Sequence, residues 1–328
     1  MAIFCTYFDR HYLARGLTLY KSLAGQLPHV DLRALCLDDE TFGVLTRLAW
    51  PGLHPVPLAE LERADPVFHG TKSGRTRLEY FFTCTPAWAT YALQYVAPGE
   101  LLVYVDADLC FYSDPTPVLD EIGAASVAII PHRFPATNGD HDPPIFGVYN
   151  VGFLAFRNDV RGRAVLADWR TSCIEWCYDT LMDRDRFADQ KYLDAWPARF
   201  PGVHVVNNPA AGLAPWNWMG HTIDDTREPL TVDGRPLIFY HYHGFRALGS
   251  WLYDAGPGGA MPSALRERLY GAYAAEVRES RRVADAVAPG VAREIPHRRD
   301  GVFTYYSALL RGLLVRAGSV QVTPSARR

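Results

Sequence analysis

The feature that most constrains this chain is an apolar run that ends abruptly in two acidic residues. Residues 101–105 (LLVYV) are apolar, and Asp106-Ala107-Asp108 follows at once. Pro98-Gly99 before the run and Ser113-Asp114-Pro115 after it are turn signals, so the run indicates a buried strand. A spacing of two residues puts both carboxylates on one side of an extended chain. The sequence therefore predicts two acidic groups where a buried strand emerges.

These two carboxylates favour a metal site. Like charges held together at the edge of an apolar sheet repel each other and lose hydration, and a divalent cation would relieve both costs. Hard oxygen ligands suit Mg²⁺ or Mn²⁺, which commonly bridge to the phosphates of a substrate. We therefore expect Asp106 and Asp108 to bind a metal beside a diphosphate. The alternative is a solvated loop, because Asp-x-Asp is short and frequent by chance.

The order of the expected elements predicts an α/β fold. Strands are expected at 2–7, 30–37 and 53–56, with helices at 9–24 and 38–48 between them. This β-α-β-α-β opening favours a parallel sheet. Further helices are expected at 86–95, 116–122, 160–181 and 187–195, and further strands at 126–130, 149–156, 203–206 and 237–240. Segments 60–76, 134–147 and 208–235 show no periodicity and are expected to be irregular.

The composition limits the kinds of binding partner and the cellular compartment that we expect for this chain. The formal net charge of −3 predicts no general attraction to nucleic acid. The apolar runs are far shorter than a membrane span, and the N-terminal residues lack the basic region of a signal peptide. The six cysteines lie mostly inside apolar runs, as reduced and buried residues do. We therefore expect a cytoplasmic protein.

A Gly- and Pro-rich stretch at 256–259 marks a change in the chain. Residues 1–255 are expected to form a catalytic domain, and 256–328 a helical C-terminal extension with a disordered tail. Within the extension, 302–315 is amphipathic. It is expected either to pack on the core or to lie on a membrane surface, which would make the protein membrane-peripheral.

Two stretches could complete the metal site. His241 and His243 follow the last expected strand, and borderline metals accept imidazole beside carboxylates, so either could be the third ligand. Asn150 offers an amide to a sugar hydroxyl, and Gly152, inside a strand, indicates close approach by a ligand or another backbone. The plainer interpretations are hydrogen-bonded histidines and a bulge with a capping asparagine.

Two more stretches could lie beside a reacting centre or a diphosphate. Asp189 and Gln190 follow a polar loop, where they would either cap a helix or lie beside a reacting centre. The basic run 72–77 includes Arg75 and Arg77, which could stabilise a leaving diphosphate. A solvated basic loop is the alternative for this run.

In their order and their positions relative to strands, these motifs resemble the GT-A fold nucleotide-diphospho-sugar glycosyltransferases, most closely the retaining family 8 enzymes. The similarity extends over residues 1–246. It implies a Rossmann-like, mixed and mainly parallel sheet flanked by helices. It also implies a hexosyltransferase-type enzyme with Mn²⁺ or Mg²⁺, a nucleotide-sugar donor with UDP as the expected nucleotide, and an acceptor that is a glycan, a lipid-linked saccharide or a small molecule.

The resemblance gives each motif residue an expected role. Donor binding is expected from Thr6, Asp9, Tyr12, Arg75, Arg77, Asp106, Gly152 and Arg246. Metal binding is expected from Asp106, Asp108 and either His241 or His243, and catalytic contacts near the anomeric carbon from Asn150, Asp189 and Gln190. One motif departs from the family. Its usual Gly-x-x-Lys-Pro-Trp is absent after His241, so Arg246 is expected to replace the lysine.

Several mechanisms and classes stay open. Retention would proceed by attack from the leaving-group side, or by double displacement with Asp189 as the nucleophile. Inversion would need a carboxylate base, for which Asp140 or Asp142 could serve. A haloacid dehalogenase-type phosphatase also has Asp-x-Asp after a strand, but has Thr or Val where this chain has Cys110. A catalytically silent protein would bind the sugar nucleotide without transferring the sugar.

Overall fold

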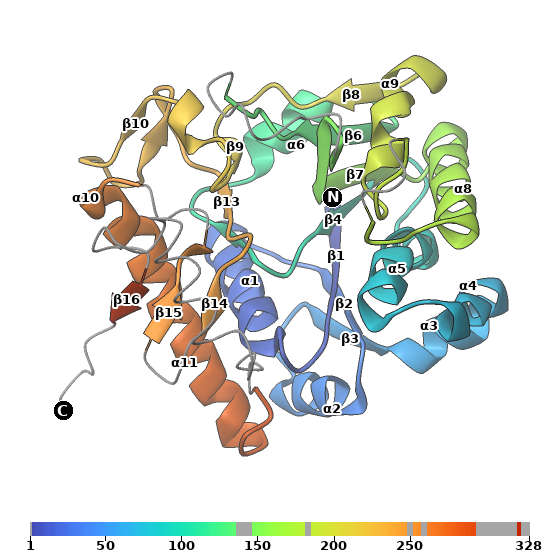
Figure 1. Ribbon diagram of the computed structural model, residues 1–328, viewed down its shortest axis with the longest axis horizontal. Helices are drawn as coiled ribbons and strands as arrows, with labels where there is room; N and C mark the ends of the chain where they lie inside the picture. The colour runs from blue at the N-terminus through green and yellow to red at the C-terminus, as the bar shows by residue number, and fades with distance from the viewer. Residues whose placement is uncertain are drawn as a thin grey trace.

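A seven-stranded sheet with strand order β3-β2-β1-β4-β7-β6-β8 runs through the middle of the fold (Figure 1). The computed structural model describes residues 2–135, 146–180, 185–247, 252–256, 261–292 and 320–322. The strands of this sheet are β1 (Ala2–Phe8), β2 (Leu32–Cys36), β3 (Leu53–Pro57), β4 (Leu101–Val105), β6 (Val127–Pro131), β7 (Tyr149–Arg157) and β8 (Val203–Val205).

Strand β7 is the exception in a sheet that is otherwise parallel. The pairs β1–β2, β2–β3, β1–β4 and β6–β8 are parallel, whereas β7 runs antiparallel to β4 and β6. This arrangement confirms the predicted mixed and mainly parallel sheet. It also has a consequence for function, because the start of β7 lies at the same edge as the carboxyl end of β4.

Helices cover both faces of the sheet, and strand β4 shows why. All five of its side chains are buried, and they alternate between two hydrophobic clusters. Val103 packs in the cluster of α1 (Leu13–Gln26), α2 (Asp39–Leu48) and α11 (Ala272–Val287). Leu102 packs in the cluster of α5 (Arg77–Ala92) and α8 (Val160–Glu175). Figure 1 shows the two groups of helices on opposite sides of the sheet. A strand that is buried on both faces needs apolar side chains at every position, which explains the continuous apolar run at 101–105.

Smaller elements surround this core. One three-stranded sheet has the order β5-β13-β9, with β5 (Leu109–Phe111), β13 (Phe239–His241) and β9 (Ala211–Leu213). The others are β10 (Ile223–Asp224), β11 (Thr231–Val232) and β12 (Arg235–Pro236), and β14 (Arg246–Ala247), β15 (Leu252–Asp254) and β16 (Val320–Val322). The short helices are α6 (Thr116–Ile122), η2 (Leu93–Tyr95), α9 (Trp196–Arg199), η3 (Lys191–Ala195), η4 (Trp218–Gly220) and α10 (Ser263–Arg266).

The helices after residue 260 pack against the strand that ends at His241. Tyr242, directly after β13, stacks on Tyr273 of α11 with ring centroids 3.6 Å apart and planes 3° apart. The hydroxyls of Tyr240 and Tyr270 are 2.9 Å apart in a buried hydrogen bond. A C-terminal helical segment is therefore present, as predicted. The division of the chain at 255 stays a prediction, and 302–315 lies outside the described residues.

Three predictions of local structure were wrong. Segment 60–76 is helical, with α3 (Leu58–Ala64), α4 (Pro66–Gly70) and the turn η1 (Thr71–Gly74). Each of the two α-helices buries only one side chain, Leu61 or Phe68, so no periodicity is visible. Helix α5 begins at Arg77 rather than 86, because Thr76 and Glu79 form a capping box and Pro86 lies inside the helix. Segment 208–235 contains strands too short to show alternation.

Other boundaries moved, and the prediction of buried cysteines held. Helix α8 ends at Glu175 rather than 181, and the helix expected at 187–195 is a turn followed by η3. All six cysteines are free and buried, as expected. None of the helices in the described part of the chain has the length and apolar character needed to span a membrane. The candidate bases Asp140 and Asp142 lie outside the described residues.

The capping box gives a test of why α5 starts where it does. The Thr76 hydroxyl accepts a hydrogen bond from the Glu79 N–H at 3.3 Å, and the Glu79 carboxylate accepts one from the Thr76 N–H at 2.8 Å. We expect Thr76→Ala to lower the free energy of unfolding by about 1 kcal/mol, measured by chemical denaturation. Thr171→Ala makes the same change inside α8, away from a helix end, and should leave stability nearly unchanged. Equal losses in the two variants would contradict the capping role.

Candidate functional site

The two acidic residues lie in a turn directly after β4. The Asp106 N–H donates to the carbonyl of Gly152 in β7 at 3.0 Å, and the Leu109 N–H donates back to the Asp106 carbonyl at 3.1 Å. The expectation of extended backbone through both aspartates was therefore wrong. The turn, rather than strand alternation, brings the two carboxylates together.

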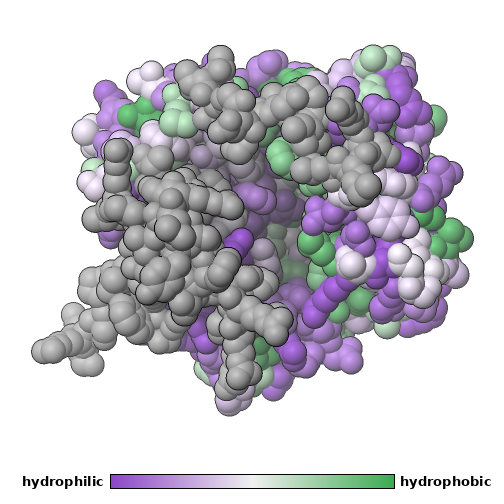
Figure 2. All heavy atoms as spheres, viewed as in Figure 1, coloured by the Kyte–Doolittle hydropathy of each residue, from purple (hydrophilic) through white to green (hydrophobic). Residues whose placement is uncertain are grey.

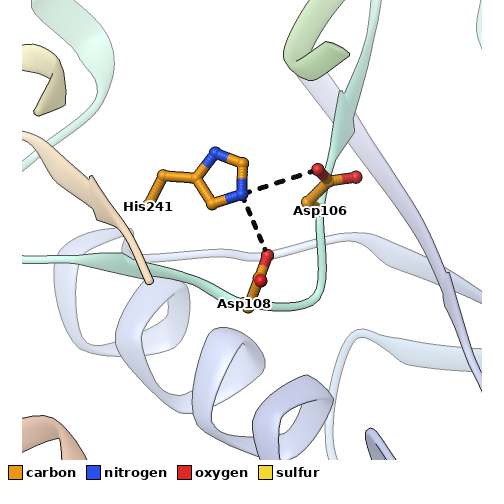
Figure 3. Close-up of side chains that lie close together, drawn as sticks. All are labelled: Asp106, Asp108 and His241. Carbon is orange, nitrogen blue, oxygen red and sulfur yellow. Dashed lines mark ion pairs between the residues drawn. The ribbon is translucent and has the colours of Figure 1, made fainter. Parts of the chain in front are cut away.

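The imidazole of His241 meets both carboxylates from the neighbouring small sheet. Strand β13 pairs antiparallel with β5, with His241 opposite Leu109, and the Tyr242 N–H donates to the Asp108 carbonyl at 2.9 Å. His241 Nε2 consequently lies 3.2 Å from Asp108 Oδ1 and 3.7 Å from Asp106 Oδ2 (Figure 3). Within the described residues, these three side chains form the one group whose ligand atoms all lie within 4.8 Å of one another.

The charges of the three side chains shift one another's pKa values. Burial alone would raise the pKa of Asp108, but the charge and hydrogen bond of His241 outweigh it and lower that pKa to about 2. Burial raises the pKa of Asp106, and His241 opposes this. Burial works against a charged imidazole, yet Asp108 and Asp106 raise the pKa of His241. Two carboxylates and one imidazole fit Mn²⁺ or Mg²⁺, which would take the place of the imidazole proton.

Gly152 leaves the space in which the His241 ring lies. A Cβ atom at this position would be 2.5 Å from Asn150 Oδ1 and 2.7 Å from His241 Nδ1. The sequence indicated close approach to this glycine, and the groups that approach it are these two side chains. Because Nδ1 faces Gly152 and Nε2 faces the carboxylates, Nε2 is the ligand atom that His241 offers.

Asn150 and Gln190 are brought together beside the carboxylates. Asn150 Oδ1 accepts a hydrogen bond from the Gly152 N–H at 2.9 Å, and its Nδ2 donates to Gln190 Oε1 at 3.3 Å. Gln190 Oε1 also accepts from the Val151 N–H at 3.3 Å, and its Nε2 donates to the Phe146 carbonyl at 2.8 Å. The two amides are thus oriented by backbone groups at the start of β7, an arrangement suited to holding a polyhydroxyl ligand.

Asp189 lies beneath this surface. It is 5% exposed, and its carbonyl accepts a hydrogen bond from the Trp169 indole at 2.7 Å. Burial raises the pKa of its carboxyl to about 7, with a further rise from the charge of Asp106 and an opposing hydrogen bond from Thr85. The Thr85 hydroxyl is also 3.0 Å from the hydroxyl of Tyr7. Asp189 is therefore part of a buried polar layer under the site edge.

The residues expected at the nucleoside and the diphosphate fall into two groups. Asp9 forms an ion pair with Arg77 at 2.7 Å and accepts from the Tyr12 N–H at 3.2 Å, while the Tyr12 ring is 42% exposed. Thr6 is completely buried in β1, and its hydroxyl has no partner within the described residues. Arg75 donates to the Ile174 carbonyl at 2.7 Å and so links the start of α5 to α8. The structure thus groups Asp9, Tyr12 and Arg77, whereas Thr6 is buried in β1 and Arg75 binds the backbone of α8.

The alternative histidine and the expected replacement for lysine lie outside the metal group. His243 is exposed, and its ring centroid is 5.9 Å from that of His241. Arg246 is exposed in β14, where it pairs with Asp254 of β15. Of the two histidines, His241 is the one that contacts the carboxylates.

The sequence did not single out Tyr104, His132 or Trp216. The Tyr104 hydroxyl donates to Asp106 Oδ1 at 2.7 Å. His132 is buried just after β6, with Nε2 3.4 Å from Asn150 Nδ2, and burial lowers its pKa to about 4. Position just after a strand could have indicated His132, by the same rule that indicated Asp106. Trp216 comes from the segment without periodicity.

A small hollow with a cavity volume of about 10 Å³ opens beside these groups. Its lining is mostly apolar, with polar groups at one end: Ile130, Pro131, Asn150, Gly152, Phe153, Gly212, Trp216, Phe239 and His241. Figure 2 shows a hollow near the centre of the molecular face with hydrophilic residues on its walls.

Gly152→Ala tests whether the missing side chain is what allows the group to form. The new Cβ would overlap His241 and Asn150, so we expect the variant to lose at least tenfold in Mn²⁺ affinity, measured by titration calorimetry. Gly25→Ala in α1 meets nothing within 4 Å and serves as the control, with unchanged affinity expected. Normal Mn²⁺ binding by Gly152→Ala would show that the close contact is unimportant.

The buried carboxyl of Asp189 predicts a pH dependence of stability. The folded chain holds this proton more tightly than the unfolded chain, so the free energy of unfolding falls as the pH rises from about 4 to about 7. Asp189→Asn keeps a neutral side chain at every pH. In metal-free buffer we expect it to be more stable than the original chain at pH 8 and to show a clearly smaller gain at pH 5.

Urea denaturation at the two pH values measures this difference. Asp120→Asn, at an exposed position of α6, is the matched control and should change stability equally at both pH values. A gain for Asp189→Asn that is the same at pH 5 and pH 8 would contradict the assignment of a raised pKa.

Comparison with known proteins places these features in context. No protein-family model matches the chain. The uncharacterized protein YfnD of Bacillus subtilis (strain 168) is 32% identical over 245 residues, which cover 74% of this chain and 77% of YfnD. YfnF of the same organism is 33% identical over 250 residues, covering 74% and 81%.

Among solved structures, the chain is similar to that of the galactosyltransferase LgtC in complex with donor and acceptor sugar analogues. The TM-score is 0.53 at 16% identity, with 88% of this chain and 96% of LgtC covered. At this identity the similarity concerns the fold, and it confirms the predicted GT-A fold.

Proposed function

The chain belongs to the same protein family as YfnD and YfnF of Bacillus subtilis, and we propose that it is a metal-dependent glycosyltransferase. In this proposal it moves a sugar from a nucleotide diphosphate sugar, with UDP as the nucleotide, to a glycan, lipid-linked or small-molecule acceptor. The observation that carries the proposal is the contact of His241 with Asp106 and Asp108 at the sheet edge of a GT-A fold. Membership of glycosyltransferase family 8, with retention, is part of the proposal.

The metal group has the chemistry that diphosphate departure needs. Mn²⁺ or Mg²⁺, held by Asp106, Asp108 and His241, would neutralise charge that develops on the leaving diphosphate. Asp108 and His241 are buried and Asp106 is half-buried, and β4, β5 and β13 orient the three side chains, so little rearrangement is expected on binding. Tyr104 holds one oxygen of Asp106, which leaves the other facing His241.

In this proposal, the remaining polar residues contact different parts of the donor. Tyr12 offers an exposed ring and Asp9 an ordered carboxylate to the nucleoside, with Arg77 and Arg246 for the phosphates. Asn150 and Gln190 face the sugar next to the metal group. These two amides have their hydrogen-bonding atoms fixed by the backbone, so they can orient sugar hydroxyls without first becoming ordered.

The position of Asp189 favours one of the retaining mechanisms. A nucleophile in a double displacement must reach the anomeric carbon, whereas this carboxyl is 5% exposed and burial raises its pKa to about 7. Both features support attack from the leaving-group side, with the departing phosphate accepting the proton of the acceptor. NMR of the product anomer tests retention, and an inverted product would remove both retaining mechanisms.

Asp108→Asn tests the metal-dependent function directly. The amide keeps the size of the side chain but lacks the charge, so we expect loss of Mn²⁺-dependent donor binding and at least a hundredfold loss of transfer. Thermal shift with a panel of nucleotide sugars, with and without Mn²⁺, measures binding, and donor hydrolysis measures turnover. Asp39→Asn, exposed at the start of α2, is the matched control.

The same panel separates the remaining alternatives. A catalytically silent protein would be stabilised by a donor yet neither hydrolyse nor transfer it. No response of the original chain to any donor would contradict the proposed function. The GT-A fold argues against a haloacid dehalogenase-type phosphatase.

A further inference from the structure

Three histidine rings surround the indole of Trp216, and each meets it at a steep angle. The ring centroids of His241, His132 and His243 lie 5.3, 5.4 and 5.6 Å from that of Trp216, with interplanar angles of 76°, 66° and 68°. Edge-to-face geometry at these distances is favourable for aromatic pairs. One of the three rings belongs to the metal group, so Trp216 contacts that group directly.

Hydrogen bonds hold this tryptophan in place. Its Nε1 donates to the carbonyl of His132 at 2.9 Å. The next residue, Asn217, is completely buried and donates to the same carbonyl at 3.0 Å and to that of Gly212 at 2.9 Å. Asn217 also accepts from the Ala214 N–H at 2.8 Å. The loop that carries the indole is therefore fastened to the end of β6 and to β9.

The His241 ring is then bounded on three sides. Gly152 lies against its Nδ1 and Cε1, where a Cβ atom would come within 2.8 Å of each. Asp106 and Asp108 lie at its Nε2, and Trp216 lies at ring-contact distance. Rotation of an imidazole about its Cβ–Cγ bond replaces a ligand nitrogen with a carbon. A metal site tolerates only a small error in ligand position, so a neighbour that restricts this rotation affects affinity.

We propose that Trp216 is a positioning residue that holds the His241 imidazole with Nε2 toward Asp106 and Asp108. The indole acts through His241 and does not itself contact the ion. The inference depends on the proposed function only for the identity of the ion. It gives the segment 208–235 a role at the metal group.

A double-mutant cycle tests this role. Titration calorimetry with Mn²⁺ alone is performed on the original chain, Trp216→Ala, His241→Ala and the double variant. We expect Trp216→Ala to weaken Mn²⁺ binding about tenfold. In the His241→Ala background it should have no further effect, because its only route to the ion has been removed. Trp216→Phe retains an aromatic edge but no indole N–H, and should fall between the original chain and Trp216→Ala.

The control is another half-buried tryptophan away from the metal group. Trp50 stacks on Tyr20 with centroids 5.2 Å apart, so Trp50→Ala should lose stability without changing Mn²⁺ affinity. Unchanged affinity in Trp216→Ala would overturn the proposal. An equal loss in both backgrounds would also overturn it, because Trp216 would then act by another route.

A crystal structure of metal-free Trp216→Ala tests the same proposal without reference to an ion. We expect the His241 ring to rotate or shift from its place over Gly152, and a ring that stays in place overturns the positioning role. If the original chain binds no Mn²⁺, the proposed metal-dependent function fails. The crystal structure still decides the role of Trp216.

Discussion

The whole site depends on one backbone hydrogen bond, from the Asp106 N–H to the Gly152 carbonyl. It joins the end of β4 to the start of β7, and it is available because β7 runs against an otherwise parallel sheet. With no side chain at Gly152, the His241 ring can lie against the backbone at this point. Had β7 been parallel, its start would lie at the opposite edge, and Asn150 would be remote from the carboxylates.

A second constraint is the cost of gathering charges away from water. Asp106 and Asp108 are tolerated because His241 compensates for their charge and the Tyr104 hydroxyl satisfies one further oxygen. Below them, Asp189 is kept from ionising at low pH values by burial, which raises its pKa to about 7. Such groups reduce the stability of an unliganded chain and favour binding of a cation.

Much of the site could be predicted because strand ends in an α/β sheet share one edge. Asp106, Asp108, Asn150 and His241 all follow or begin expected strands, so their convergence follows from the order of elements. His132 satisfies the same rule and was overlooked because a lone histidine carries no motif. Trp216 could not have been found. Its place depends on hydrogen bonds to the carbonyl of His132, far away in sequence, and no local pattern encodes such a contact.

The short helices and the start of α5 were predicted incorrectly for a related reason. The helices α3 and α4 each bury one side chain, and a single anchor gives no periodicity. The start of α5 was encoded locally, in Thr76 and Glu79, but the proline at 86 gave a competing signal that tertiary packing overrides. The turn at Asp106 depends on pairing with β7, so a purely local interpretation favoured extended backbone.

The stacking of Tyr242 on Tyr273 has a consequence for how the protein is made. Synthesis on the ribosome delivers both aspartates early, His241 much later, and the helix that buttresses its strand later still. A nascent chain that has released β4 therefore holds an acidic edge without its imidazole or the aromatic support behind it. Completion of the site therefore awaits the helices after residue 260.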